Sequence, residues 1–180
     1  MPKQAMQSVT FEPVDPSEPD SLAAWLASDT RPCHGVSSLD LEAARHRVRD
    51  GFLDDALAFW MLVGSERIGL FRLHDLSDPT PGLDIRIRTA WRGQGLGKVG
   101  LRWVTDYVFK KLPDKIRVEG NTRVDNVGMR RVFEACGYVK EAHFRRAWPG
   151  ADGVNYDCTA YGILREDWEA GSITPVAWDS

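Results

Sequence analysis

Three alternating glycines, Gly93, Gly95 and Gly97, stand between two basic residues, Arg92 and Lys98. Glycine has no Cβ, so its backbone can come within hydrogen-bond reach of a phosphate group. A helix N-terminus offers unpaired N–H groups and the positive end of the helix dipole, and together these bind anions. If a helix begins at this turn, the turn can bind a diphosphate mainly through main-chain amides.

The glycine spacing excludes two common phosphate-binding loops. No Gly-Lys-Ser/Thr ends the turn, as a P-loop requires, and the glycines do not follow the Rossmann order. The pattern Arg92-x-x-Gly95-x-Gly97 is short, so two other interpretations stay open at this point. One is an ordinary turn between a strand and a helix. The other is a binding site for a nucleotide or another phosphometabolite.

The glycine turn lies inside a predicted β-α-β unit. Residues 83–88 alternate apolar and polar side chains, which is typical of a half-buried strand. The helix predicted after the turn, at about 95–112, has a regular apolar face, and a strand at 115–119 follows it. Two strands joined through a helix in this way are expected to be parallel.

The other elements follow from the same kind of pattern. We expect strands at 9–11, 56–63, 68–76, 138–145 and 157–164, and helices at 21–27, 38–50 and 126–136. Ser21 is the predicted N-cap of the first helix, and Gly51 the predicted C-cap of the second. This order predicts an α/β protein with layers of helices around a mixed sheet.

Composition narrows the class of protein. The chain has 180 residues, 43% hydrophobic residues and a net charge of −3, which predicts one globular domain over 1–180 with polar tails at about 1–8 and 169–180. A net negative charge argues against a nucleic-acid-binding protein, because such a protein needs a basic surface. No apolar run reaches the length of a membrane span, and no secretory leader is visible, so we expect a cytoplasmic protein without membrane contact. Three cysteines without metal spacing predict neither disulfides nor a metal site.

Three segments in order resemble one known family. The first is the glycine turn after the fourth predicted strand, and the second is 118–138, with Asn126 and the run Cys136-Gly137-Tyr138. Both resemble the GNAT superfamily of acyl-CoA-dependent N-acyltransferases. The third, 141–168, is similar to the closing hairpin of one branch, the ribosomal-protein N-terminal acetyltransferases (RimJ/RimL). Together they cover nearly the whole chain.

The resemblance implies a mixed, mostly antiparallel sheet that splays at a central pair of parallel strands, with helices on both faces. It also implies acetyl-CoA as donor and CoA as product, with the pantetheine arm lying in the gap between the two strands. The residues expected to contact the cofactor are Ile87, Arg88, Arg92, Gly93, Gln94, Gly95, Leu96, Gly97, Lys98, Asn126, Met129 and Phe133.

The implied reaction is direct attack of a neutral amine on a thioester carbonyl, which needs a base and a polarised carbonyl. Asp84 is the first candidate base, because it is the only carboxylate on the fourth predicted strand, and Glu119 is the second. Asp84 could instead pair with Arg86 or Arg88, and Glu119 could be a solvated charge at a strand end.

Two positions depart from the family pattern. Many relatives carry a tyrosine where this chain has Phe133, and the RimJ/RimL branch a serine where it has Met129. Neither residue can protonate a leaving thiolate. Tyr107, Tyr156, Tyr161, Cys136 or water could do so, or no protein acid is needed, because a thiolate is a tolerable leaving group near neutral pH.

The acceptor side is expected in the loop that holds Arg31, Cys33 and His34, although these residues could also be ordinary surface residues. We therefore expect an N-acetyltransferase that acts on a primary amine of a small molecule or of a protein N-terminus. A homodimer is compatible with the resemblance. The rival hypothesis is a non-catalytic acyl-CoA-binding or regulatory module, which Phe133 and Met129 favour.

Overall fold

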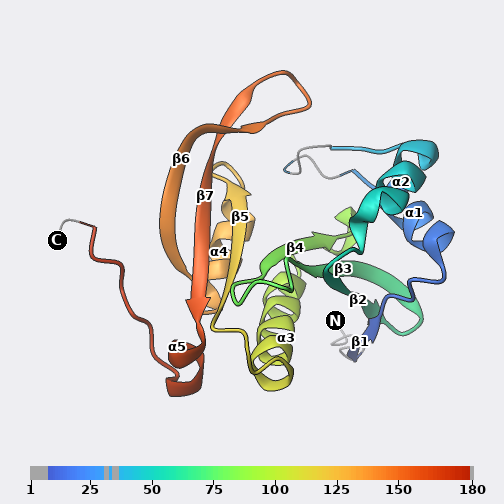
Figure 1. Cartoon of the computed structure of the whole chain (residues 1–180). Helices are drawn as coiled ribbons and strands as arrows, with labels where there is room; N and C mark the ends of the chain where they lie inside the picture. Colours follow the sequence, from blue (N-terminus) through green and yellow to red (C-terminus); the bar gives the residue numbers. More distant parts are fainter. Residues whose placement is uncertain (1–7, 31–32, 34–36, 179–180) are drawn as a thin grey trace, which may run out of the picture.

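The computed structural model describes residues 8–30, 33 and 37–178, and its strands form one seven-stranded sheet in the order β1-β2-β3-β4-β5-β7-β6 (Figure 1). The strands are β1 Val9–Pro13, β2 Ala56–Val63, β3 Glu66–His74, β4 Gly82–Ile87, β5 Arg117–Arg123, β6 Val139–Pro149 and β7 Asn155–Leu164. The helices are α1 Pro19–Ala27, α2 Leu41–Arg47, η1 Val48–Phe52, η2 Thr89–Trp91, α3 Leu96–Lys111, α4 Val127–Ala135 and α5 Arg165–Ala170.

Strands β4 and β5 form the one parallel pair of this sheet, and they are joined only at their beginnings. Gly82 opposes Glu119, and the Glu119 amide donates to the Pro81 carbonyl at 3.1 Å. Beyond that point the strands diverge, while every other neighbouring pair is antiparallel. The mixed sheet splayed at a central parallel pair, as the sequence predicted, is confirmed.

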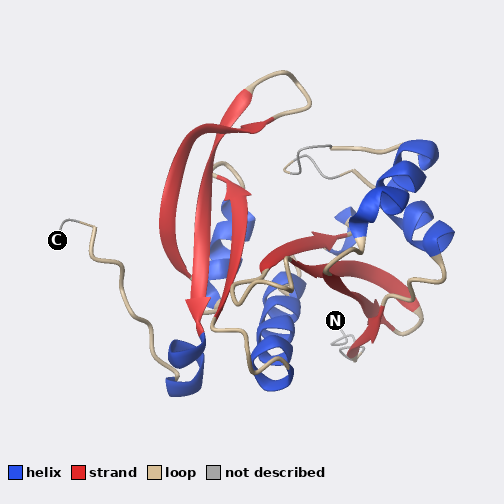
Figure 2. Ribbon diagram, in the orientation of Figure 1, coloured by secondary structure: helices blue, strands red, loops and turns tan. Residues whose placement is uncertain are grey.

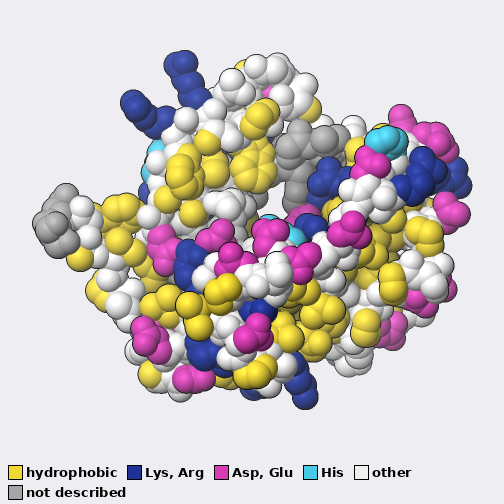
Figure 3. All heavy atoms as spheres, viewed as in Figure 1, with side chains coloured by type: hydrophobic (Ala, Val, Ile, Leu, Met, Phe, Trp, Pro, Cys, Tyr) yellow, Lys and Arg dark blue, Asp and Glu magenta, His cyan; other side chains and the backbone are white. Residues whose placement is uncertain are grey.

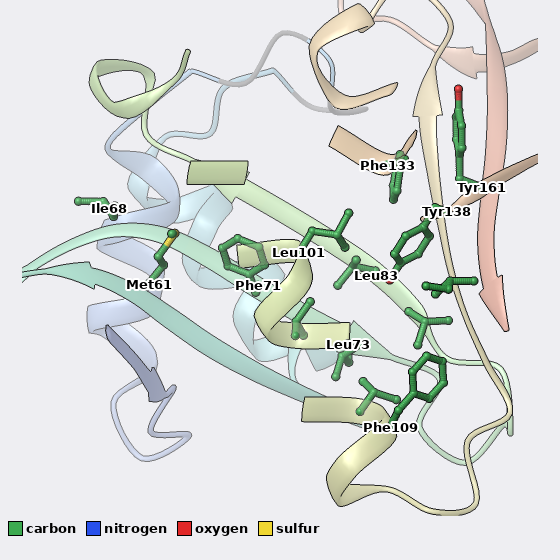
Figure 4. Close-up of a cluster of buried hydrophobic side chains, with 14 of the residues drawn as sticks. Met61, Ile68, Phe71, Leu73, Leu83, Leu101, Phe109, Phe133, Tyr138 and Tyr161 are labelled. Carbon is green, nitrogen blue, oxygen red and sulfur yellow. The ribbon is translucent and has the colours of Figure 1, made fainter. Parts of the chain in front are cut away.

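Helices cover both faces of the sheet (Figure 2). Side chains of β2 alternate between them: Met61 belongs to the core under α3 and α4, and Trp60 to the core under α1 and α2. The larger core contains stacked aromatic and aliphatic side chains from α3, α4 and five strands (Figure 4). These two layers hold the divergent strands from opposite sides.

Helix α3 fixes the glycine turn against the sheet. Its apolar face is buried through Leu101, Val104 and Val108, as the periodicity predicted. Gly100 lies so close to β3 that a Cβ there would stand 1.9 Å from Cζ of Phe71. This close approach sets the height of the helix above the sheet, and therefore the position of its N-terminus.

One predicted helix end is wrong, and another agrees with the structure. Helix α1 begins at Pro19 with Glu18 as N-cap, because proline suits the first turn, while the Ser21 hydroxyl accepts a bond from Arg67. The helix predicted at 38–50 begins at Leu41 and continues from α2 into η1, where a kink at Asp50 and Gly51 interrupts the helical dihedrals. Gly51 has a φ of +91°, the left-handed conformation of the C-cap glycine that the sequence predicted. That kink turns Phe52 back under the sheet, where it is buried.

Replacing Gly100 with alanine is expected to destabilise the protein by about 2 kcal/mol, because overpacking a core typically costs 1–3 kcal/mol. Helix propensity alone predicts the opposite sign, a gain of about 1 kcal/mol. Chemical denaturation measures the free energy of unfolding. The matched control is Gly128→Ala in α4, where the nearest atom to a new Cβ lies 3.8 Å away. Equal stability of both variants would contradict the packing argument.

Candidate active site

The divergence of β4 and β5 opens two adjoining cavities. The vertex cavity, about 430 Å³, lies where the strands separate and is lined by Gly82, Asp84, Arg86, Glu119 and Phe133 among others. The loop cavity, about 480 Å³, is lined by the glycine turn and the start of α4. Four residues, Cys33, Ile85, Asn126 and Met129, line both cavities, so the cavities adjoin, and together they are called the groove.

The glycine turn leaves its amides open to the loop cavity. Gly93 and Gly95 have φ values of +76° and +80°, and nothing lies within 4 Å of a Cβ built on either. Lys98 and Val99 donate the first bonds of α3, both to the Gly95 carbonyl, so the amides before them precede the helical ladder. Helix α3 therefore begins at the glycine turn, as the sequence predicted, with its first amides outside the helical ladder.

A residue that sequence reasoning missed, Asp29, holds the base of this turn. Its carboxylate accepts from the Thr89 amide at 2.6 Å and the Thr89 hydroxyl at 2.8 Å, and it lies 3.8 Å from the Arg92 guanidinium. Burial opposes ionisation of Asp29, but these bonds and charges prevail and lower its pKa. No sequence signal joins positions 60 residues apart.

Arg92 and Gln94 both bond back to the protein. Arg92 donates from Nε to the Ile87 carbonyl at 2.9 Å and from Nη2 to the Thr30 carbonyl at 3.0 Å. The Gln94 side chain donates to the Ala90 carbonyl, and Gln94 is not among the residues that line either cavity. The side chains of the turn thus brace it, while the lining of the loop cavity includes Arg92, Leu96, Gly97 and Lys98.

Strand β4 turns one main-chain edge toward the groove. The Arg88 amide donates to the Ile68 carbonyl of β3, and its side chain lies over Trp25, so Arg88 is directed away from the cavities. Successive amides of a strand alternate in direction, so those of Ile85 and Ile87 face β5. Ile85, which the sequence analysis did not single out, therefore joins Ile87 along the groove.

Asn126 and Phe133 form the opposite wall. Asn126 caps α4: its Oδ1 accepts from the Met129 amide at 3.2 Å and its Nδ2 donates to the Thr122 hydroxyl at 3.0 Å. Phe133 is buried and stacks on Tyr161 at 5.0 Å between ring centroids (Figure 4). Gly120 makes room for this ring, because a Cβ there would stand 2.6 Å from Phe133 Cζ.

Both candidate bases line the vertex cavity, and both are ion-paired. Asp84 accepts from Nε and Nη2 of Arg86, the latter at 2.6 Å, and Arg86 is 5% exposed. Glu119 accepts from Arg117, which also binds Glu141. The pairing of Asp84 with Arg86 is thus present in the structure, and it holds the carboxylate in the cavity wall.

Cys33 lies where the two cavities meet, and burial raises the pKa of its thiol. Arg31 and His34 lie outside the described residues. All four tyrosines are among the described residues, and none of them lines either cavity. Tyr161 is fully buried, and its hydroxyl bonds Glu134. Burial raises the pKa of Tyr161, so it is a weak acid placed behind Phe133.

Two further residues, Arg47 and Trp148, line the vertex cavity. Arg47 enters through the kinked end of α2, and Trp148 through the outer strand β6. Within the described residues there is no group of three or more His, Cys, Asp or Glu side chains that could hold a metal ion. No helix in that part of the chain is long and apolar enough to cross a membrane.

A family model described as an acetyltransferase (GNAT) domain matches residues 8–139. The chain belongs to this family. The match contains the glycine turn, the divergent strands and the wall built by α4. GNAT acetyltransferases use acetyl-CoA as the donor. No curated protein sequence matches the chain significantly.

Solved structures share the GNAT fold at low sequence identity. A spermidine N-acetyltransferase from Vibrio cholerae, in complex with CoA and spermine, superposes with a TM-score of 0.74 at 15% identity, over 89% of this chain and 98% of that one. A GNAT-family acetyltransferase from Bacillus anthracis gives a TM-score of 0.71 at 16% identity, over 88% and 95%. At this identity the likeness establishes the fold alone.

Replacing Asn126 with alanine is expected to cost about 1 kcal/mol of stability, the typical value of a lost N-cap. Asn126→Asp retains the acceptor for the Met129 amide and should lose less, although it cannot donate to Thr122. Thermal unfolding of the two variants distinguishes the bond from the Met129 amide to Oδ1 from the bond that Nδ2 donates to Thr122. If both variants lose stability equally, the stabilising bond is the one to Thr122 and not the helix cap.

Proposed function

We propose that this chain is an N-acetyltransferase that moves an acetyl group from acetyl-CoA directly to a primary amine. One observation carries the proposal: the N-terminus of α3 and the open inner edge of β4 border the same groove. A helix N-terminus suits a diphosphate, and an open strand edge suits an extended amide chain. Acetyl-CoA has both parts in one molecule.

The residues present fit such a donor. The space above Gly93 and Gly95 lets a diphosphate approach the amides of the turn, and Lys98 adds positive charge. The main chain of Ile85 and Ile87 would bond the pantetheine arm, with Asn126 and Met129 on the other side. Phe133 would wall the thioester end in the vertex cavity.

When bound, the donor supplies a thioester carbonyl and a thiolate leaving group. An amide of β4 facing the groove would polarise the carbonyl, and Asp84, or else Glu119, would take the proton from the amine. Burial raises the pKa of the thiols of Cys33, Cys136 and Cys158, so each stays protonated near neutral pH and is a weak nucleophile. This supports direct transfer without an acyl-cysteine.

For the acceptor we propose a class of molecule and not an individual compound. A primary amine of a small molecule or of a protein N-terminus fits the open vertex cavity, and the RimJ/RimL branch remains our assignment within the family. A cytoplasmic location and a homodimer are further parts of the proposal. The first rests on the sequence, and the second on the family resemblance alone.

Gly95→Asp is expected to weaken CoA and acetyl-CoA binding at least about tenfold, because the new carboxylate would face the diphosphate. Calorimetric titration measures the dissociation constant. Gly153→Asp is a matched control, since Gly153 has a φ of +79° and open space around its Cβ but lies in the β6–β7 turn. Equal affinities of the two variants would place the diphosphate elsewhere.

The unmodified protein is assayed with acetyl-CoA and a broad panel of amines. The assay detects the free thiol of CoA that acetyl transfer releases. Turnover with any amine supports the proposed activity. Binding of CoA without turnover across the panel would favour the non-catalytic acyl-CoA-binding module. Stabilisation by ATP or NAD but not by CoA would favour a nucleotide site and overturn the proposal.

Asp84→Asn is expected to lower kcat by about 10²- to 10⁴-fold and to remove the acidic limb of the pH–rate profile, as loss of a general base does. Glu119→Gln, the comparison variant, should change kcat less. CoA affinity monitors the integrity of the site in both. An unchanged kcat and pH profile for Asp84→Asn, with loss in Glu119→Gln, would transfer the role of base to Glu119.

A further inference from the structure

Three arginines from three elements surround one aromatic ring. The guanidinium carbons of Arg72, Arg86 and Arg47 lie 4.7, 5.5 and 5.6 Å from the ring centroid of Phe52. Phe52 itself is buried on the α1–α2 side of the sheet. Each contact is a cation–π interaction, which offsets part of the cost of bringing like charges together.

The negative charge beside this arginine cluster is smaller than the positive charge. Asp84 binds Arg86 through three hydrogen bonds, and Arg72 donates to the Phe52 carbonyl, which is neutral. Arg47 makes no hydrogen bond or ion pair with the described residues, and its side chain lines the vertex cavity. Partial desolvation and the charge of Arg86 lower the pKa of Arg47, and the charge of Asp84 offsets only part of this shift. Arg47 is an exposed residue, so its guanidinium is accessible to a ligand.

A second donor in the same cavity lacks a partner. The indole Nε1 of Trp148 is buried and bonds no acceptor among the described residues. The pairing of β6 with β7 shifts between Phe144 and Trp148, and Arg146 has a φ of +53° there. This irregularity lies where the strand carries Trp148 to the cavity. A buried donor without an acceptor is costly, so a ligand oxygen would satisfy it.

We propose that the acceptor amine also carries an anionic oxygen group, a carboxylate, which binds Arg47 and the Trp148 indole N–H in the vertex cavity. The inference rests on the proposed function and names its substrate class. A guanidinium binds a carboxylate by charge-assisted hydrogen bonds. An amine a few atoms from that carboxylate would lie beside Asp84, which lines the same cavity.

A polyamine is a poor match for this cavity. Both carboxylates that line it, Asp84 and Glu119, already bind arginines, and Arg47 would repel a second ammonium group. The space-filling view shows the molecular surface hollowed between the β6–β7 hairpin and α2, with basic and acidic side chains interspersed on the α2 side (Figure 3). The acceptor class thus differs from that of the spermidine acetyltransferases with the same fold.

The first test compares amino acids with their amides: leucine with leucinamide, phenylalanine with phenylalaninamide, and glycine with glycinamide, together with spermidine. A nearby carboxylate favours the protonated amine, so intrinsic reactivity favours the amides. We expect kcat/KM to be at least about tenfold higher for the acids, a preference that only the site can create. Equal or higher rates with the amides or spermidine would overturn the inference.

The second test changes Arg47. Arg47→Gln is expected to raise KM for the acids by about 10- to 100-fold, the usual worth of a charge-assisted hydrogen bond, and so to remove the preference for acid over amide. Arg47→Lys should retain part of the preference, because the charge remains. The matched control is Arg49→Gln, an exposed arginine two residues away that lines neither cavity. A preference that survives in Arg47→Gln would overturn the assignment.

Two further experiments distinguish this inference from a binding site for the acyl chain and from failure of the proposed function. If kcat/KM is higher with succinyl-CoA than with acetyl-CoA, and Arg47→Gln removes this preference, the arginine cluster binds the acyl chain of the donor. That result would overturn the acceptor assignment. If CoA binds but no amine is acetylated, the proposed function fails. The anionic site is then judged by thermal shift with N-acetyl-leucine and N-acetyl-leucinamide in the presence of CoA. Stabilisation by the acid alone, lost in Arg47→Gln, supports the site, and no stabilisation overturns it.

Discussion

The separation of β4 from β5 is the constraint on which the rest of this structure depends. The strands are bound at Gly82 and Glu119 and then part, so their inner main-chain groups lack a strand partner. Unpaired backbone groups are costly when buried, and they are tolerated where they face solvent or a ligand. The sheet remains intact because β3 and β7 pair fully with the outer edges. The separation at the centre thus creates a groove, while the sheet continues on both sides of it.

The two layers of helices act on this groove in different ways. Helix α3 is held down by the contact of Gly100 with Phe71, and its first turn therefore stands at the open end of the divergent strands. Helix α4 begins at Asn126 and places Phe133 against Gly120 and Tyr161, which closes the other end. On the opposite face, Arg47 at the end of α2 lines the vertex cavity, and the kink at Gly51 places Phe52 beneath its guanidinium. The glycine turn and the vertex cavity are thus positioned by helices on opposite faces of the sheet.

Charge is distributed along the groove in a way that follows from these positions. At the glycine turn the carboxylate of Asp29 accepts hydrogen bonds from Thr89 and pairs with Arg92. Its negative charge is therefore balanced locally, and the N-terminus of α3 keeps its positive potential. In the vertex cavity Asp84 is held by Arg86 within a cluster of three guanidinium groups. Positive charge therefore lies at both ends of the groove, and the central part, around Ile85 and Met129, is apolar.

The sequence by itself determined the elements, their order and the position of the anion-binding turn, because periodicity and glycine spacing are local properties of the chain. It also singled out Asp84, as the only carboxylate on its strand, and Asn126 and Phe133, through their places in the family pattern, and all three line the groove. Only the tertiary structure decided that Arg88 faces β3, that Asp29 braces the turn and that Arg47, Arg72 and Arg86 meet at Phe52. These contacts join residues up to 60 positions apart. Their geometry is set by strand register and by one helix kink, which no local pattern encodes.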